Sequence, residues 1–147
     1  MRCMADVLTQ AERRFCMSQI RGKHTKPEMI VRRLAHSLGY RYRLHDRNLP
    51  GSPDLVFPSR RQVIFVHGCF WHRHRCKLGR PMPASRRNFW AMKLLKNKQR
   101  DRAARRKLCR ADWEVLVVWE CQTKDLEKLS KKLATFLDAH SQLQKIA

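Results

Sequence analysis

The 147-residue sequence is poor in acidic side chains. Asp and Glu together number 12 against 33 Lys and Arg, which gives a formal net charge of +21 at pH 7. A surface with this excess of one sign repels itself unless a polyanion binds to it. The shortage of carboxylates therefore indicates a nucleic acid as the working partner.

The sequence also lacks any long apolar run. No segment reaches the roughly 18 apolar residues that a membrane span needs, and residues 1–6 contain no apolar core of a secretory signal. No basic helix pairs with the wide apolar face of a membrane-surface binder. We therefore expect a cytoplasmic protein whose six cysteines stay reduced, so that clustered cysteines indicate a metal site rather than disulfides.

Length and hydrophobic spacing predict one α/β domain. Thr25, Pro27 and Glu28 are typical of a helix start, because Thr25 can accept from the Glu28 amide and Pro27 suits the first turn. Gly39 then ends this helix, and Thr123 is expected to cap the last one. The expected strands are 40–44, 55–57, 63–66 and 113–119, and the other expected helices are 11–20 and 85–110. This order predicts a mixed central sheet flanked by helices.

Two of these elements carry further expectations. Residues 115–118 are wholly apolar, which predicts a strand buried on both faces. The helix 85–110 carries eleven Lys and Arg against a single acid, Asp101, so phosphate contact explains it better than a solvated face. The apolar positions of this helix are Phe89, Met92, Leu95 and Leu108.

The segment 50–76 holds most of the side chains capable of chemistry. Asp54 opens the strand 55–57, where an Asp is often only a turn residue. The hairpin of strands 55–57 and 63–66 is expected to bring Asp54 and His67 to one end of the sheet. A lone carboxylate with a backbone carbonyl and waters suits Mg²⁺, which keeps much of its hydration.

Three ligand-type residues lie close together in the loop after this hairpin. Cys69, His74 and Cys76 have suitable spacing for a metal, and Cys121 follows a predicted strand. Together they predict a tetrahedral structural zinc site. His72 fits the spacing as well as His74 does, and the alternative is that the cysteines are scattered and free.

Candidate proton-transfer groups flank the same loop. His67 and His72 lie on a strongly basic protein beside a possible metal carboxylate, so proton transfer or phosphate contact is a credible role. A lone histidine is more often structural. Glu28 completes a helix cap, and it is a candidate to contact the metal through water.

Adjacent aromatic residues interrupt the ligand cluster. Phe70 and Trp71 are consecutive, so their side chains point to opposite sides of an extended chain and do not easily enter one core. On a nucleic-acid binder, projecting rings stack on bases or wedge between base steps. Trp90 is a third candidate, for which core packing is the alternative.

Three strings of residues closely resemble the bacterial very short patch repair (Vsr) endonucleases. They are Pro-Gly-Ser-Pro-Asp at 50–54, Phe-Val-His-Gly-Cys-Phe-Trp-His-Arg-His-Arg-Cys at 65–76 and Val-Val-Trp-Glu-Cys at 117–121. The helix start at Thr25 and Asn-Phe-Trp at 88–90 also fit. The resemblance extends over residues 17–136.

The resemblance implies a restriction-endonuclease-like core with residues 1–24 as a DNA-contacting arm and 25–139 as the nuclease core. It implies a Mg²⁺-dependent enzyme that nicks double-stranded DNA 5′ to the T of T:G mismatches, which arise when 5-methylcytosine deaminates. The nick starts very short patch repair. A restriction-type nuclease of the same fold and a non-catalytic zinc-stabilised DNA-binding module are the alternatives.

The resemblance also implies roles for individual residues. Asp54 and the Val66 carbonyl match the Mg²⁺ ligands, and Val66 stands where some members have Thr. His72 matches the general base, and His67 and Glu28 match groups that assist it. The implied zinc ligands are Cys69, His74, Cys76 and Cys121. The implied DNA-contacting residues are Phe70, Trp71, Trp90, Met17, Lys93 and Asn97. Double-stranded DNA is the expected partner of a monomer, with mismatch-repair proteins as candidate partners.

Overall fold

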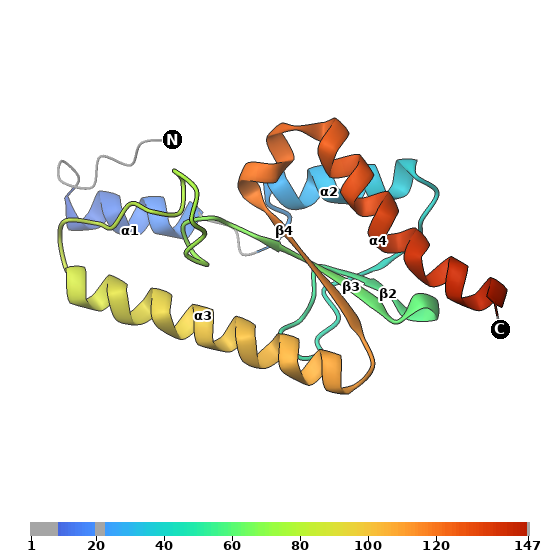
Figure 1. Cartoon of the computed structure of the whole chain (residues 1–147). Coiled ribbons are helices and arrows are strands. Elements are labelled where there is room, and N and C mark those ends of the chain that lie inside the picture. Colours follow the sequence, from blue (N-terminus) through green and yellow to red (C-terminus); the bar gives the residue numbers. More distant parts are fainter. Residues whose placement is uncertain (1–8, 20–22, 147) are drawn as a thin grey trace.

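The computed structural model describes residues 9–19 and 23–146 and has the α/β architecture that the sequence predicts (Figure 1). Four strands form one sheet in the order β1-β2-β3-β4. β1 pairs antiparallel with β2, β2 antiparallel with β3, and β3 parallel with β4, so the sheet is mixed. The strands are β1 Arg43–Leu44, β2 Leu55–Phe57, β3 Gln62–His67 and β4 Glu114–Trp119.

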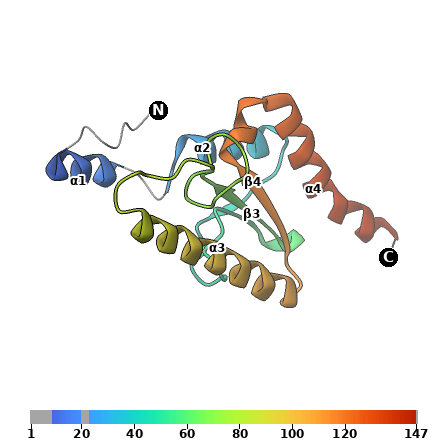
Figure 2. The same cartoon turned by 60° about the vertical axis from the view of Figure 1, so that its left-hand side comes forward.

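Helices cover both faces of this sheet (Figures 1 and 2). The α-helices are α1 Gln10–Gln19, α2 Lys26–Ser37, α3 Arg87–Arg110 and α4 Leu126–Ile146, and short 3-10 turns span Pro58–Arg60 and Glu120–Lys124. α2 and α4 pack on one face and α3 crosses the other. No helix in these described ranges is long and apolar enough to cross a membrane.

Alternating side chains of β2 and β3 build the two cores. Leu55 and Ile64 point to the core under α2 and α4, whereas Val56 and Val63 point to the core under α3. This period of two is what an extended chain imposes. Both strands are therefore buried on both faces, and they form the rigid centre from which the loop after His67 departs.

The first strand is shorter than predicted. Residues 40–44 alternate between half-buried and exposed, as expected, but only Arg43–Leu44 pairs with β2. The Tyr40 amide instead donates to the Ala35 carbonyl at the end of α2. The rings of Tyr40 and Tyr42 pack edge-on against Phe57, so side-chain packing rather than strand pairing explains the alternation.

The prediction that residues 115–118 are buried on both faces is wrong. β4 is an edge strand, and only Val118 within it is buried. Val117 faces an open pocket between β4 and α3. The apolar run therefore reflects one covered face and one face beside a cavity.

Two predicted helix features are also wrong. Thr123 lies in the turn Glu120–Lys124, where its hydroxyl donates to the Glu120 carbonyl, and Asp125 caps α4 by accepting from the Lys128 amide. Of the four apolar positions expected on α3, Leu108 is buried, but Phe89, Met92 and Leu95 are 45%, 61% and 55% exposed, and the other buried residue is Leu94. α3 is thus rotated relative to the apolar face that was expected.

Candidate active site and metal centre

A largely buried carboxylate, Asp54, lies immediately before β2. The Oδ2 atom of Asp54 accepts a hydrogen bond of 2.7 Å from the Val66 amide on β3, and the Asp54 side chain is 18% exposed. The N–H and C=O of one strand residue point to the same side, so the Val66 carbonyl faces Asp54 as well. Burial raises the pKa of Asp54 most strongly, the hydrogen bond from Val66 opposes this, and the nearby charge of Glu28 adds to it, so that the pKa is about 6.

Glu28 joins this site through a histidine that the sequence reasoning missed. Glu28 is 2% exposed, and its Oε1 lies 2.9 Å from Nε2 of His45. Nδ1 of His45 lies 3.8 Å from Oδ1 of Asp54. His45 therefore stands between two carboxylates. Its position follows from the β1–β2 ladder, because the residue after Leu44 faces the residue before Leu55.

The helix cap at Glu28 differs slightly from the one expected. The Thr25 hydroxyl accepts from the Glu28 amide, as predicted. The Glu28 carboxylate reaches back to the His24 amide at 2.9 Å, one residue earlier than the cap residue itself. One oxygen thus secures the start of α2 while the other is turned toward His45 and Asp54.

A bound cation at Asp54 would offset the cost of burying this carboxylate and its repulsion by Glu28, which lies across His45 and also pairs with Arg32 at 3.6 Å. The ligand types, a carboxylate with a backbone carbonyl, are those that Mg²⁺ takes. The residues present therefore fit a divalent metal at Asp54.

His67 and His72 stack face to face next to this carboxylate site. Their ring centroids lie 3.8 Å apart with an interplanar angle of 6°. Nδ1 of His72 lies 2.5 Å from Oδ2 of Asp101 on α3. In the sequence, Asp101 stands out only as the single acid of a basic helix. A lone carboxylate among so many cations could have indicated a specific partner.

Burial lowers the pKa of His67 most strongly, the charges of His72 and Arg105 act in the same direction and Asp101 opposes them, so that the pKa is about 4. His67 is therefore neutral at pH 7 and can offer a hydrogen bond but no charge. His72, by contrast, is paired with a carboxylate that fixes the orientation of its ring.

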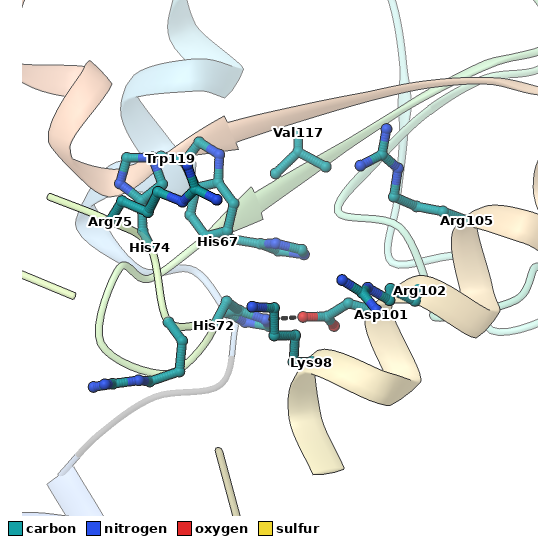
Figure 3. A pocket seen from close by; sticks show the side chains of 11 residues that line it. His67, His72, His74, Arg75, Lys98, Asp101, Arg102, Arg105, Val117 and Trp119 are labelled. Atoms are coloured by element: carbon teal, nitrogen blue, oxygen red, sulfur yellow. Dashed lines mark hydrogen bonds and ion pairs between the residues drawn. The ribbon is translucent and has the colours of Figure 1, made fainter. Parts of the chain in front are cut away.

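The stacked histidines form one wall of a pocket of about 300 Å³ (Figure 3). α3 forms another wall, and the edge of β4 with the loop after His74 closes the third side. The lining residues are His67, His72, Arg73, His74, Arg75, Lys98, Asp101, Arg102, Arg105, Val117 and Trp119.

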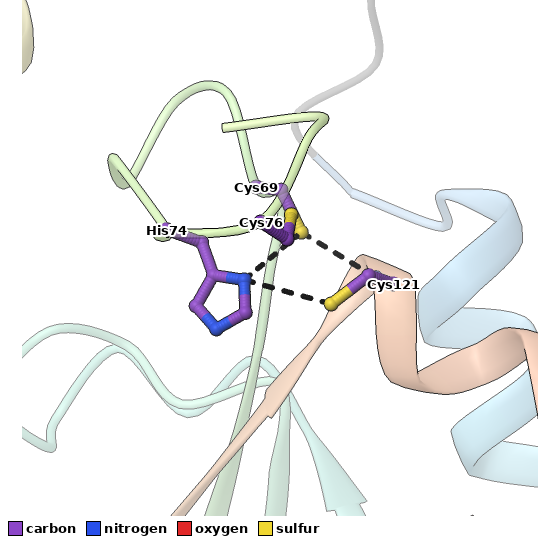
Figure 4. A group of neighbouring side chains, drawn as sticks. All are labelled: Cys69, His74, Cys76 and Cys121. Carbon is purple, nitrogen blue, oxygen red and sulfur yellow. Dashed lines mark hydrogen bonds between the residues drawn. The ribbon is translucent and has the colours of Figure 1, made fainter. Parts of the chain in front are cut away.

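Three thiols and one imidazole form a second cluster behind this pocket (Figure 4). Cys69, His74, Cys76 and Cys121 each offer a ligand atom, and these atoms all lie within 4.8 Å of one another. Nδ1 of His74 is 3.5 Å from the sulfur of Cys121 and 3.8 Å from that of Cys69. His74, not His72, therefore lies among the thiols, and the donor set fits tetrahedral zinc.

The thiols differ in their readiness to ionise. Burial raises the pKa of Cys69 to about 12 and also raises that of Cys121. For Cys76 burial acts in the same direction, but hydrogen bonds from His74, Cys69 and nearby amides outweigh it and bring the pKa to about 6. One thiolate is thus available at neutral pH, and a bound metal would ionise the others.

A tight loop brings these ligands together. A Cβ atom on Gly79 would lie 2.0 Å from the His74 carbonyl oxygen and 2.8 Å from that of Cys69. Only glycine fits such a close approach of backbone to backbone. The loop from Gly68 to Gly79 therefore wraps around the cluster, and it carries His72 on the same segment.

The predicted aromatic residues form one cluster outside both cores. The rings of Phe70, Trp71 and Trp90 lie 5.1 to 5.9 Å apart and are half-buried. Nζ of Lys93 lies 5.5 Å from the ring centroids of both tryptophans. The Asn97 amide donates to the Trp71 carbonyl. The loop and α3 thus present a single aromatic surface with a cation on it.

The remaining predicted residue, Met17, lies in α1, and its side chain falls outside the described part of the structure, as does much of the arm 1–24. The structure brings together Asp54, Glu28, His67 and His72 around one end of the sheet. It brings together the four metal-ligand candidates and the three aromatic rings in two adjoining clusters.

Comparisons with known proteins agree with this arrangement. Residues 5–78 match the family model described as DNA mismatch endonuclease Vsr. The chain is 50% identical over 135 residues to the type II nicking enzyme V.XorIIP of Xanthomonas oryzae pv. oryzae, covering 92% of this chain and 98% of that protein. It is 42% identical over 132 residues to the DNA mismatch endonuclease Vsr of Escherichia coli, covering 90% and 84%.

Proposed function

The chain belongs to the Vsr family of DNA mismatch endonucleases and is an endodeoxyribonuclease that acts on DNA, and on this basis we propose that it nicks double-stranded DNA 5′ to the T of a T:G mismatch. The substrate would be the product of 5-methylcytosine deamination, and the nick would start very short patch repair. The observation that carries the proposal is that one loop holds both His72 and the aromatic residues Phe70 and Trp71. Contact of the aromatic residues with the mismatch would therefore also position His72 for cleavage, because both lie on the same loop.

Asp54 and the Val66 carbonyl would hold Mg²⁺, which supplies polarisation of the scissile phosphate and stabilises the charge that develops on it. Glu28 is connected to this site through His45. We propose that Glu28 and His45 hold the Asp54 carboxylate and its waters in place. A buried carboxylate with such a partner loses little freedom when the metal binds.

His72 acts as the general base in this proposal. Its Nδ1 atom is held by Asp101, which leaves Nε2 to take a proton from the attacking water. The carboxylate fixes the tautomer and ring orientation, and it stabilises the imidazolium that forms. His67, neutral and stacked on His72, keeps the ring in plane and can hydrogen-bond the phosphate.

Phe70, Trp71 and Trp90 would wedge into the duplex beside the mismatch, with Lys93, Asn97 and Met17 near the mispaired bases. A mispaired step costs less to unstack than a matched one, so the deformability of the DNA adds to discrimination. A zinc ion on Cys69, His74, Cys76 and Cys121 would stiffen the loop that carries the wedge and the base.

Asp54→Ala separates this proposal from a non-catalytic module. We expect the variant to lose Mg²⁺-dependent nicking of a T:G duplex by about 10³-fold or more and to bind the same duplex nearly as well as the wild type. Nicking gels and fluorescence anisotropy measure the two quantities. A wild type that binds but never cuts would support the binding module, and equal loss of binding would make Asp54 structural.

A further inference from the structure

The face of α3 that packs toward the sheet has only two buried residues, and they lie fourteen positions apart. Leu94 and Leu108 are 1% and 0% exposed. Helical spacing places Lys98, Asp101 and Arg105 on the same stripe between them, at four, seven and eleven residues after Leu94. A helix normally continues its apolar stripe through such a stretch. Cationic residues in these positions therefore need an explanation other than solubility.

These side chains face the pocket beside His67 and His72 (Figure 3). Lys98, Arg102 and Arg105 line it from α3, and the loop adds Arg75. The only carboxylate in the lining is Asp101, which is already engaged by His72. None of the ion pairs among the described residues includes the three α3 cations.

The two sides of the stacked histidines thus have opposite electrostatic character. On one side, Asp54 is the carboxylate that suits a metal cation, and Glu28 beyond it is paired with Arg32 at 3.6 Å. On the other side, at least three cations line a pocket of about 300 Å³ whose single carboxylate, Asp101, is hydrogen-bonded to His72. Bringing these like charges together costs electrostatic free energy, which a bound anion with several oxygen acceptors offsets. Guanidinium groups match phosphate in shape and charge.

We propose that this pocket is a phosphate subsite for the strand that is cut, and that Lys98, Arg102 and Arg105 hold a phosphate neighbouring the scissile one. The inference rests on the proposed function, because His72 is the wall shared by the pocket and the reaction site. A phosphate fixed there would position the adjacent phosphodiester between His72 and Asp54. The subsite therefore contributes to the rate of cutting as well as to affinity.

Two double variants test the subsite. Lys98→Ala/Arg105→Ala removes two pocket cations, and Lys96→Ala/Arg106→Ala removes two exposed cations of the same helix that do not line the pocket. All four side chains are exposed, so both proteins are expected to fold, which thermal unfolding checks. We expect the pocket variant to lose about tenfold or more in single-turnover nicking of a T:G duplex at saturating enzyme. The control variant should lose mainly affinity.

A scan with neutral methylphosphonate linkages identifies the contacted phosphate. At one position near the scissile bond, the neutral linkage should slow the wild type about as much as the pocket substitutions do, and it should slow the pocket variant less than about twofold further. In the control variant, the neutral linkage at that position should slow nicking by the same factor as in the wild type. Additive effects of linkage and pocket substitution at every position would overturn the subsite, as would equal nicking rates for the two double variants.

The scan also separates this inference from the proposed function. If the wild type does not nick a T:G duplex, the proposed function fails, and the same non-additivity is sought in equilibrium binding of the duplexes. A nicked duplex with a 5′-phosphate or a 5′-hydroxyl at the nick distinguishes the source of the phosphate. Tighter binding of the 5′-phosphate form, lost in the pocket variant, would place the scissile phosphate itself in the pocket and overturn its assignment to a neighbouring phosphate, whereas equal binding of both forms would support an internal phosphate there.

Discussion

Single residues at the reaction site are placed where their charges are costly, and Asp54 is the clearest case. Its folded-state pKa is raised by burial from 3.8 to about 6. An acid with a raised folded pKa favours folding below its unfolded pKa and loses that contribution as the pH rises through the folded pKa. The rise of this pKa from 3.8 to about 6 corresponds to at most roughly 3 kcal/mol of free energy of unfolding.

Asp54→Asn should therefore stabilise the Mg²⁺-free, zinc-loaded protein by about 2 kcal/mol near pH 8 and by almost nothing near pH 4, because the amide can still accept from Val66 but carries no charge. Urea unfolding at the two pH values measures the difference. The same variant should be inactive in nicking. Equal stabilisation at both pH values would show that burial does not penalise the Asp54 charge.

Asp101 offers a second test at this scale. Asp101→Asn keeps the size of the side chain but removes the charge that holds Nδ1 of His72. We expect kcat to fall by about 10²-fold or more, by analogy with other His–Asp pairs, with unchanged DNA affinity and an altered pH–rate profile. An unchanged pH–rate profile would reduce Asp101 to a surface carboxylate.

The sequence carried part of this residue-level picture. Ligand type and spacing indicated Asp54 and the cysteines, because their chemistry needs those side chains. The role of His45 depends on a two-residue strand pairing, and that of Asp101 on the distance between α3 and a loop 29 residues away. Neither relationship can be inferred from the spacing of neighbouring residues in the sequence.

Among the elements, the loop from Gly68 to Gly79 determines how the sites are related. Cys121 connects it to the end of β4 through the thiol–imidazole cluster. Cys121→Ser should lower the zinc content and destabilise the protein by about 2 kcal/mol or more, and nicking should fall because His72 loses its support. Cys109→Ser, an exposed thiol on α3 outside the cluster, is the matched control.

Metal analysis and thermal unfolding read out that comparison. Loss of zinc and stability in Cys121→Ser alone is the expected result. If the two variants contain the same zinc and melt together, the cluster holds no structural metal.

The aromatic surface on this loop makes a separate prediction. Trp71→Ala removes a ring that contacts Phe70 and Trp90 but belongs to neither core. Loss of one stacking or wedging contact is worth about 1–3 kcal/mol, and we expect most of it to appear in the preference for T:G over T:A. Met92→Ala, exposed on α3 beyond the ring cluster, should leave that preference unchanged. A uniform loss of affinity in Trp71→Ala would indicate packing instead.

The order of elements and the β2–β3 hairpin were predictable because alternation and capping act locally. The burial of β4 and the orientation of α3 were not. β4 lies at the edge of the sheet and α3 stands away from it at the pocket, and both facts depend on tertiary packing. Phe89, Met92 and Leu95 are apolar and were therefore expected to face the core, but they lie exposed on the outer side of α3.

For the whole molecule, the net charge of +21 supplies general attraction to DNA and cannot choose a mismatch or a strand. Under the proposed function, that choice would come from the aromatic surface and the reaction site, which the loop from Gly68 to Gly79 joins. Specific nicking would then be a property of the assembled domain rather than of any one cluster.

The most direct test of the proposed activity is a nicking assay with Mg²⁺ on matched duplexes that differ only in T:G or T:A, with each strand labelled separately. The proposed activity predicts one nick, 5′ to the mismatched T, in the T:G duplex, an intact opposite strand, and no cutting without Mg²⁺. Equal cutting of the T:A duplex, or cutting of both strands, would contradict it and identify a restriction-type nuclease.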